Sequence, residues 1–139
     1  MRTVVYDALP EEARKIREMV FMQEQGFEEE FDTIDDYAKH LILFDGEVAA
    51  GTCRFFLDRE RKQYVIGRIA VLRQYRGQHL GAELLEQAEI QIKRAGGETV
   101  ILHAQKQAEP FYEKQGYAEY GAPDFEEGCP HVWMFKKLN

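Results

Sequence analysis

The sequence predicts an α+β fold in which a central mixed β-sheet of about seven strands is flanked by helices on both faces. Three observations lead to this prediction. Strand-like and helix-like segments alternate along the chain, Asp45-Gly46 is a strong hairpin signal, and a long helix between two strands requires a parallel crossover. The chain has 139 residues, of which 45% are hydrophobic, so we expect one domain over residues 1–139.

Seven segments have the composition or alternation of strands. Asp45-Gly46 joins the second and third of these segments, because both residues tolerate a positive φ. In chain order, the expected strands are Thr3 to Ala8, His40 to Phe44, Glu47 to Leu57, Lys62 to Leu72, Thr99 to Ala104, Tyr117 to Tyr120 and His131 to Lys136.

Three helices are expected between these strands. The first begins at Pro10, which a first helical turn tolerates, and has apolar residues at helical spacing as far as Val20. The second runs from about Gly77 to Ala95 and ends at Gly96-Gly97. The third is a short helix from Ala108 to Gln115. The acidic segment from Glu24 to Asp36 is expected to be a loop.

Composition excludes several classes of function. The net charge of −7 opposes binding to a phosphate backbone, so nucleic acid is not an expected partner. No apolar run is long enough to span a membrane, and the first ten residues do not resemble a secretory signal, so we expect a cytoplasmic protein without a membrane partner. Cys53 and Cys129 are expected to be reduced thiols.

No metal site is expected from the spacing of the histidines and cysteines. The four histidines are scattered along the chain, and no cluster has zinc-ligand spacing. His40 and His103 lie in apolar strands and are interpreted as structural residues. A nucleophilic Cys129 is not favoured, since it would need an activating base and a covalent intermediate.

The most informative segment runs from Ile69 to Leu85. An apolar strand ends, a polar turn containing Gly77 follows, and an amphipathic helix begins. Backbone amides at a helix start have no intrahelical partner, so together they form an anion site that suits a diphosphate. Arg73 and Arg76 add positive charge. The turn has neither the Walker nor the dinucleotide-binding pattern, and an ordinary capped helix is the alternative interpretation.

Two segments resemble signatures of the GCN5-related N-acetyltransferases (GNAT). The segment Arg76-Gly77-Gln78-His79-Leu80-Gly81 resembles the family's Arg/Gln-x-x-Gly-x-Gly/Ala signature, with His79 in place of the middle glycine. The segment from Gln105 to Tyr117 resembles Asn-x-x-Ala-x-x-x-Tyr-x-x-x-Gly-Phe, with Gln105 replacing Asn and Tyr117 replacing Phe. The predicted strand order also resembles that of the family over nearly the whole chain.

Both ends of the chain resemble the small bacterial acetyltransferases typified by ElaA and YjcF, in the segments Arg17 to Gln25 and Phe125 to Met134. The resemblance implies an N-acetyltransferase that passes the acetyl group of acetyl-CoA directly to a primary amine of a small-molecule acceptor. Three alternatives stay open: acetylation of a protein or peptide amine, an acyl-CoA sensor without catalysis, and a binder of some other nucleotide. By analogy, a homodimer is also possible.

The resemblance assigns roles to individual residues. Tyr112 is the expected general acid and His131 the candidate base, with Glu127, Glu24 or a water chain as alternatives to His131. The expected cofactor-binding residues are Ile69, Ala70, Val71, Arg76, Gly77, Gln78, His79, Leu80, Gly81, Ala82, Gln105, Phe111 and Tyr112.

Four further residues are expected at the acceptor: Arg17, Glu24, Arg68 and Glu127. Arginines near positions 17 and 68 face the pocket in relatives that acylate acidic amines. Their structural alternatives are a solvated arginine on the helix surface and a cross-strand ion pair. The acidic segment from Glu24 to Asp36 suggests the opposite, a cationic amine, so the charge of the acceptor is left open.

Overall fold

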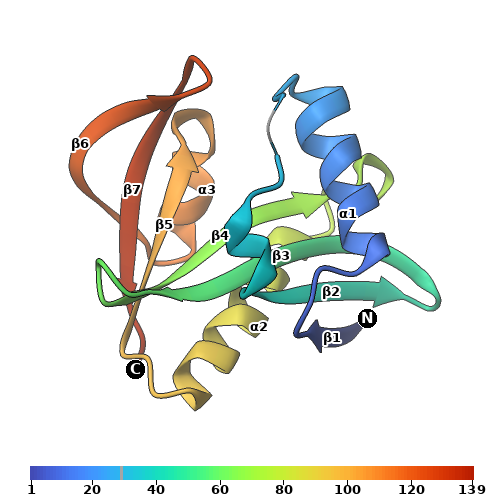
Figure 1. Cartoon of the computed structure of the whole chain (residues 1–139), viewed down its shortest axis with the longest axis horizontal. Coiled ribbons are helices and arrows are strands. Elements are labelled where there is room, and N and C mark those ends of the chain that lie inside the picture. The colour runs from blue at the N-terminus through green and yellow to red at the C-terminus, as the bar shows by residue number, and fades with distance from the viewer. Residues whose placement is uncertain (29) are drawn as a thin grey trace.

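Seven strands form one sheet in the computed structural model, which describes residues 1–28 and 30–139 (Figure 1). The strands are β1 (Arg2–Tyr6), β2 (Lys39–Asp45), β3 (Val48–Asp58), β4 (Gln63–Val71), β5 (Thr99–Gln105), β6 (Ala118–Glu126) and β7 (Cys129–Lys137). Their order across the sheet is β1-β2-β3-β4-β5-β7-β6. Only β4 and β5 are parallel among these neighbouring pairs, so the predicted mixed sheet is confirmed.

The two longer helices cover opposite faces of the sheet. Both α1 (Glu11–Arg17) and α2 (Leu80–Arg94) pack on β3 and β4. Successive side chains of β2 point to opposite faces of the sheet, so one strand packs against both helices. Leu41 and Leu43 join the core beneath α2, whereas Ile42 packs with Ala13 of α1. Figure 1 shows α1 and α2 on either side of the strands. This confirms the prediction of helices on both faces.

Several segments depart from the predicted boundaries. The first helix continues beyond α1 as a π-helical segment, Glu18–Glu24, and the predicted acidic loop contains a 3₁₀ turn, Thr33–Asp36. Glu29, also in that predicted loop, lies outside the described residues. β6 extends to Glu126, well beyond the predicted end at Tyr120, after an irregularity in its pairing with β7.

α2 begins at Leu80, later than the predicted Gly77. Gly77 and His79 adopt φ values of +82° and +62°, so a right-handed helix cannot include them. None of the helices in residues 1–28 and 30–139 is long and apolar enough to cross a membrane.

Candidate active site

The parallel strands β4 and β5 separate after a short paired stretch. Their register contains only Tyr64 opposite Val100 and Val65 opposite Ile101. Beyond Val65, the backbone groups along the facing edge of β4 have no ladder partner in β5. A pocket of about 380 Å³ lies at this opening, and both strands line it. Its volume is within the range of small-molecule sites.

A bulge in β4 shapes the wall of this pocket. Thr52 pairs with Ala70 and Arg54 with Gly67, so Arg68 and Ile69 both lie opposite Cys53. Arg68 adopts a φ of +52°, which accommodates the extra residue. Both bulged residues line the pocket, whereas Ala70 is buried in the core beneath the first helix.

The loop before α2 has the geometry of an anion site. A 3₁₀ turn, Arg73–Tyr75, is followed by left-handed Gly77 and His79, after which the first amides of α2 are exposed to a ligand. A Cβ added to Gly77 would meet no atom within 4 Å, so the loop surface there is open. The loop therefore has the backbone geometry of an anion site, and its binding of a diphosphate stays a prediction.

His79 explains why a glycine stands at this position in the family signature. Its left-handed φ is costly for most side chains, although histidine tolerates it better than β-branched residues do. The His79 side chain makes no capping hydrogen bond to the helix. His79 borders a shallow depression with Ala82 and Glu86, separate from the main pocket.

Two arginines of the loop are held by a carboxylate. The Arg76 guanidinium lies 2.9 Å from Glu24 and donates a second hydrogen bond, of 3.1 Å, to the Val71 carbonyl. Arg73 lies 3.5 Å from the same carboxylate. The hydrogen bond from Arg76 lowers the pKa of Glu24 and outweighs its partial burial. Glu24 therefore contacts the arginines of the loop and does not line the main pocket.

The second signature segment packs against the first. A Cβ on Gly81 would lie 3.1 Å from the Phe111 ring, so a small residue lets α2 approach α3 (Glu109–Lys114) closely. Gln105, at the end of β5, accepts a hydrogen bond from Gln107, donates one to Gln25, and lines the pocket. The two segments thus pack directly against each other.

Tyr112 is placed where it can act as a proton donor. It projects from α3 into the pocket wall and is partly buried. Burial raises the pKa of its hydroxyl above the usual value, with a smaller contribution from Cys53, so the phenol stays protonated at neutral pH. Burial also raises the pKa of Cys53 to about 12, so this thiol is a poor nucleophile.

His131 lies at the start of β7 and also lines the pocket, with only 5% of its surface exposed. Its Nδ1 is 2.9 Å from the Cys129 carbonyl oxygen. A carbonyl only accepts hydrogen bonds, so Nδ1 carries the proton and Nε2 of the neutral ring has a free lone pair. This is the tautomer that a general base needs.

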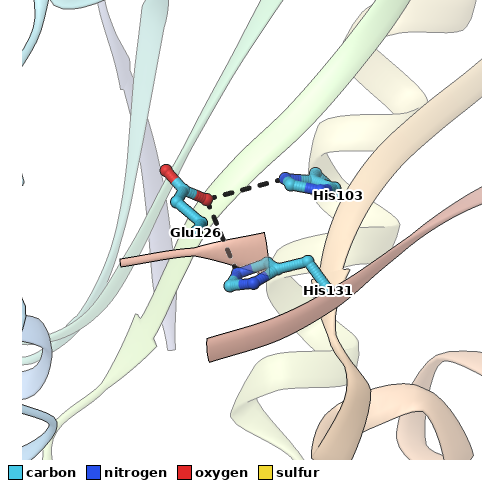
Figure 2. Close-up of side chains that lie close together, drawn as sticks. All are labelled: His103, Glu126 and His131. Atoms are coloured by element: carbon cyan, nitrogen blue, oxygen red, sulfur yellow. Dashed lines mark ion pairs between the residues drawn. The ribbon is translucent and has the colours of Figure 1, made fainter. Parts of the chain in front are cut away.

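The fold brings two further residues to His131 that the sequence did not connect with it. The ring of His103 on β5 lies against the His131 ring, tilted by 31° with 4.6 Å between centroids, and Glu126 of β6 lies 3.6 Å from His131 Nε2 (Figure 2). The sequence interpretation treated His103 as structural and overlooked Glu126. No local sequence pattern connects these residues, because they become neighbours only through the pairing of β5 and β6 with β7.

A network of six charged side chains supports the part of the pocket wall that contains Arg54 and Arg68. Arg17 is 1% exposed and bonds to Glu30 at 3.1 Å and to Asp35 at 2.8 Å. Arg54 pairs with Asp32 and Asp35, and Arg68 pairs with Glu30 at 2.9 Å and Asp32 at 3.5 Å. Burial alone would raise the pKa of Asp35, but Arg17 and then Arg54 lower it to about 2.

This network contains Arg17, one of the residues predicted at the acceptor. Its side chain does not line the pocket, and each of its nitrogens is hydrogen-bonded to Glu30 or Asp35, which favours a structural role. The alternative of a solvated arginine on the helix surface is wrong, because the side chain is buried. Arg68 does line the pocket, but its ion pairs are with the loop before β2 and not across the strands.

The other predicted residues divide between the pocket and its surroundings. Those that line the pocket are Arg68, Ile69, Gln105, Tyr112 and His131. Val71 packs against the core beneath α2, as does the buried Leu80, while Arg76, Gly77 and Gln78 are exposed in the loop. Glu24 and Glu127 border a separate shallow depression, where Glu127 accepts a hydrogen bond from the Glu28 amide.

Comparisons with known proteins agree with this geometry. The family model for the acetyltransferase (GNAT) domain matches residues 6–138. YjcF of Bacillus subtilis, an uncharacterized N-acetyltransferase, is 35% identical over 125 residues, which cover 87% of each chain. A structure from Lactobacillus plantarum, described as a candidate N-acetyltransferase, has a TM-score of 0.90 and 28% identity, covering 99% of this chain and 98% of that one.

Escherichia coli ElaA shares the fold, with a TM-score of 0.84 and 22% identity, over 97% of this chain and 98% of its own. The resemblance to ElaA and YjcF predicted from the sequence is therefore confirmed. The motifs, the splayed strands and the family match together show that this chain belongs to the GNAT acetyltransferase family and is an acyl-CoA-dependent N-acyltransferase.

Proposed function

We propose that the chain, as a single domain, transfers the acetyl group of acetyl-CoA directly to the primary amine of a small molecule. The observation that carries this proposal is that Tyr112 and His131 line one pocket at the opening between β4 and β5. This pocket brings a protonated phenol and an imidazole with a free lone pair to the same space. A pocket volume of about 380 Å³ favours a small acceptor over a protein or peptide.

In the proposed reaction, His131 acts as the base and Tyr112 as the acid. His131 Nε2 takes a proton from the acceptor ammonium, and the freed amine forms the new C–N bond at the thioester carbonyl. As the C–S bond breaks, Tyr112 donates its proton to the departing sulfur. The second amine proton leaves and restores the phenol, so one proton per turnover goes to solvent. The unpaired backbone edge near Ile69 and the loop of residues 76–82 hold the donor.

The charges around the pocket favour a basic acceptor without a carboxylate. Arg54 and Arg68, the arginines that line the pocket, are already paired with acidic residues of the network. Glu126 adds a carboxylate to the wall, and the aromatic rings of Phe56 and Trp133 also line it. A cationic amine with an apolar body matches this surface better than an acidic amine does.

The test is release of the CoA thiol from acetyl-CoA in the presence of tyramine, putrescine or glutamate. We expect turnover with a cationic amine and none with glutamate. Tyr112→Phe should lower kcat by roughly 100-fold or more while acetyl-CoA still binds. Tyr120→Phe, which changes a tyrosine outside the pocket lining, is the matched control.

The outcome also separates the alternatives. If acetyl-CoA binds but no amine in a broad panel is acetylated, the sensor hypothesis replaces catalysis. If Tyr112→Phe keeps full activity with the same amine, Tyr112 is not the acid.

A further inference from the structure

The cluster formed by His103, Glu126 and His131 contains three ligand atoms of the kinds that transition metals prefer. His103 Nδ1 and His131 Nε2 each lie 3.6 Å from the same oxygen of Glu126 (Figure 2). All three atoms lie within 4.8 Å of one another. Two imidazoles and one carboxylate suit Zn²⁺, Ni²⁺ or Cu²⁺ rather than Mg²⁺ or Ca²⁺.

In each imidazole ring, the nitrogen that faces away from Glu126 makes a hydrogen bond to an acceptor. The nitrogen that faces Glu126 is therefore left as an acceptor. His103 Nε2 lies 2.7 Å from a carboxylate oxygen of Asp124, which accepts the Nε2 proton. His131 Nδ1 donates to the Cys129 carbonyl. When the rings are neutral, His103 Nδ1 and His131 Nε2 therefore carry lone pairs.

Three electron-rich atoms thus face one another. Both N···O distances of 3.6 Å exceed a hydrogen bond, so a proton shared between Glu126 and either ring does not account for the arrangement. A cation between the three atoms would offset their repulsion. Protein metal sites commonly have this outer arrangement, in which each ligating histidine donates its other N–H to a carboxylate or a carbonyl.

The separations are close to those of a tetrahedral site. Donors about 2.1 Å from a zinc ion lie roughly 3.4 Å apart, near the two 3.6 Å distances. The two nitrogens, which lie within 4.8 Å, must approach by at most about 1.4 Å. His103 can supply that movement because its side chain is 23% exposed. Three protein ligands leave a fourth position open toward the pocket.

We propose that His103, Glu126 and His131 bind one divalent transition-metal ion, such as Zn²⁺, and that the bound ion inhibits acetyl transfer by occupying His131 Nε2. The binding part of this proposal is independent of the acetyl-transfer reaction. The inhibitory part rests on the proposed function, in which the same lone pair accepts the ammonium proton.

Binding is tested by titrating Zn²⁺ into the purified protein in competition with a chromogenic chelator, and Co²⁺ absorption reports the coordination geometry. We expect one ion per chain and the visible bands of tetrahedral Co²⁺. Glu126→Gln and His103→Gln should each weaken Zn²⁺ binding at least 10-fold, and Asp124→Asn should weaken it about 10-fold through His103. Circular dichroism confirms that each variant is folded.

Two control variants exclude other zinc ligands. Cys129→Ser removes the neighbouring thiol, and His79→Gln removes an exposed histidine outside the cluster. Both should bind Zn²⁺ as the unchanged protein does. The metal site is overturned if the protein binds no stoichiometric Zn²⁺, if Glu126→Gln and His103→Gln bind it normally, or if Cys129→Ser abolishes binding.

Inhibition is measured as acetylated product formed in zinc-buffered solution. We expect Zn²⁺ to stop turnover over the concentration range in which it binds, and Glu126→Gln to need at least 10-fold more Zn²⁺ for the same inhibition. Zinc binding that depends on Glu126 but leaves turnover unchanged would overturn the inhibitory part and the base role of His131. Turnover without any zinc binding would overturn the metal site and leave the proposed function intact.

Discussion

The carboxylate of Glu24 lies 2.9 Å from the guanidinium of Arg76, and this ion pair joins the π-helical segment after α1 to the loop that precedes α2. In this position Glu24 offsets the positive charge that the loop offers to a diphosphate. Arg73, at 3.5 Å, shares the same carboxylate.

We therefore expect Glu24→Gln to tighten acetyl-CoA binding by a few fold and to make it more sensitive to salt, because one competing negative charge is removed. Calorimetric titration at two salt concentrations checks this. Glu28→Gln, a neighbouring exposed glutamate, is the control. Weaker binding by Glu24→Gln would mean that Glu24 instead holds Arg76 in the orientation that binding requires.

His79→Gly should stabilise the fold. The left-handed φ of +62° costs a side-chain-bearing residue about 1 kcal/mol, and glycine avoids most of that cost, although its freer unfolded state offsets part of the gain. We expect a rise in Tm on thermal unfolding. His79→Ala keeps a Cβ in the same conformation and should show no rise. Equal Tm values for the two variants would contradict strain as the explanation.

Arg17→Met should destabilise the protein by about 3 to 5 kcal/mol, because it leaves Glu30 and Asp35 buried without one of their cationic partners. Denaturant unfolding measures this change. Arg14→Met, on the same helix but with a half-exposed side chain, should change the free energy of unfolding by no more than about 0.5 kcal/mol. Similar losses for both variants would contradict the structural role of Arg17.

Asp35 should make part of the stability depend on acidic pH. Its folded-state pKa of about 2 lies below the ordinary 3.8, so its contribution is fully present above about pH 4 and is lost as the pH falls toward 2. The lost contribution is about 2 kcal/mol.

We expect the difference in unfolding free energy between the unchanged protein and Asp35→Asn to shrink by that amount between pH 5 and pH 2. Asp36→Asn, at an exposed neighbouring site, should show no such trend. A difference that stays constant over this pH range would mean that Asp35 titrates normally in the folded protein.

Local sequence patterns were sufficient for the sheet, the anion loop and the second signature segment. Gly77 and the helix that follows it predicted an anion-binding turn, and the structure adds that left-handed His79 moves the helix start to Leu80. Such patterns are carried by residues close together in the chain, so one sequence reveals them.

Contacts between distant residues could not be predicted in this way. Helical periodicity cannot show that Arg17 is buried, because its partners lie 13 and 18 residues further along the chain. His103, Glu126 and His131 meet only because β5 and β6 both pair with β7. The separation of β4 from β5, which opens the pocket, likewise depends on packing across the sheet.

We propose that the loop before α2 and the opening between β4 and β5 form one acetyl-CoA site. A calorimetric titration of acetyl-CoA, with ATP and NAD as parallel controls, measures binding at this site. We predict saturable binding of one acetyl-CoA per chain, a matching rise in Tm, and no comparable binding of ATP or NAD. Absence of acetyl-CoA binding, or equal binding of ATP, would contradict a single acetyl-CoA site formed by these two elements.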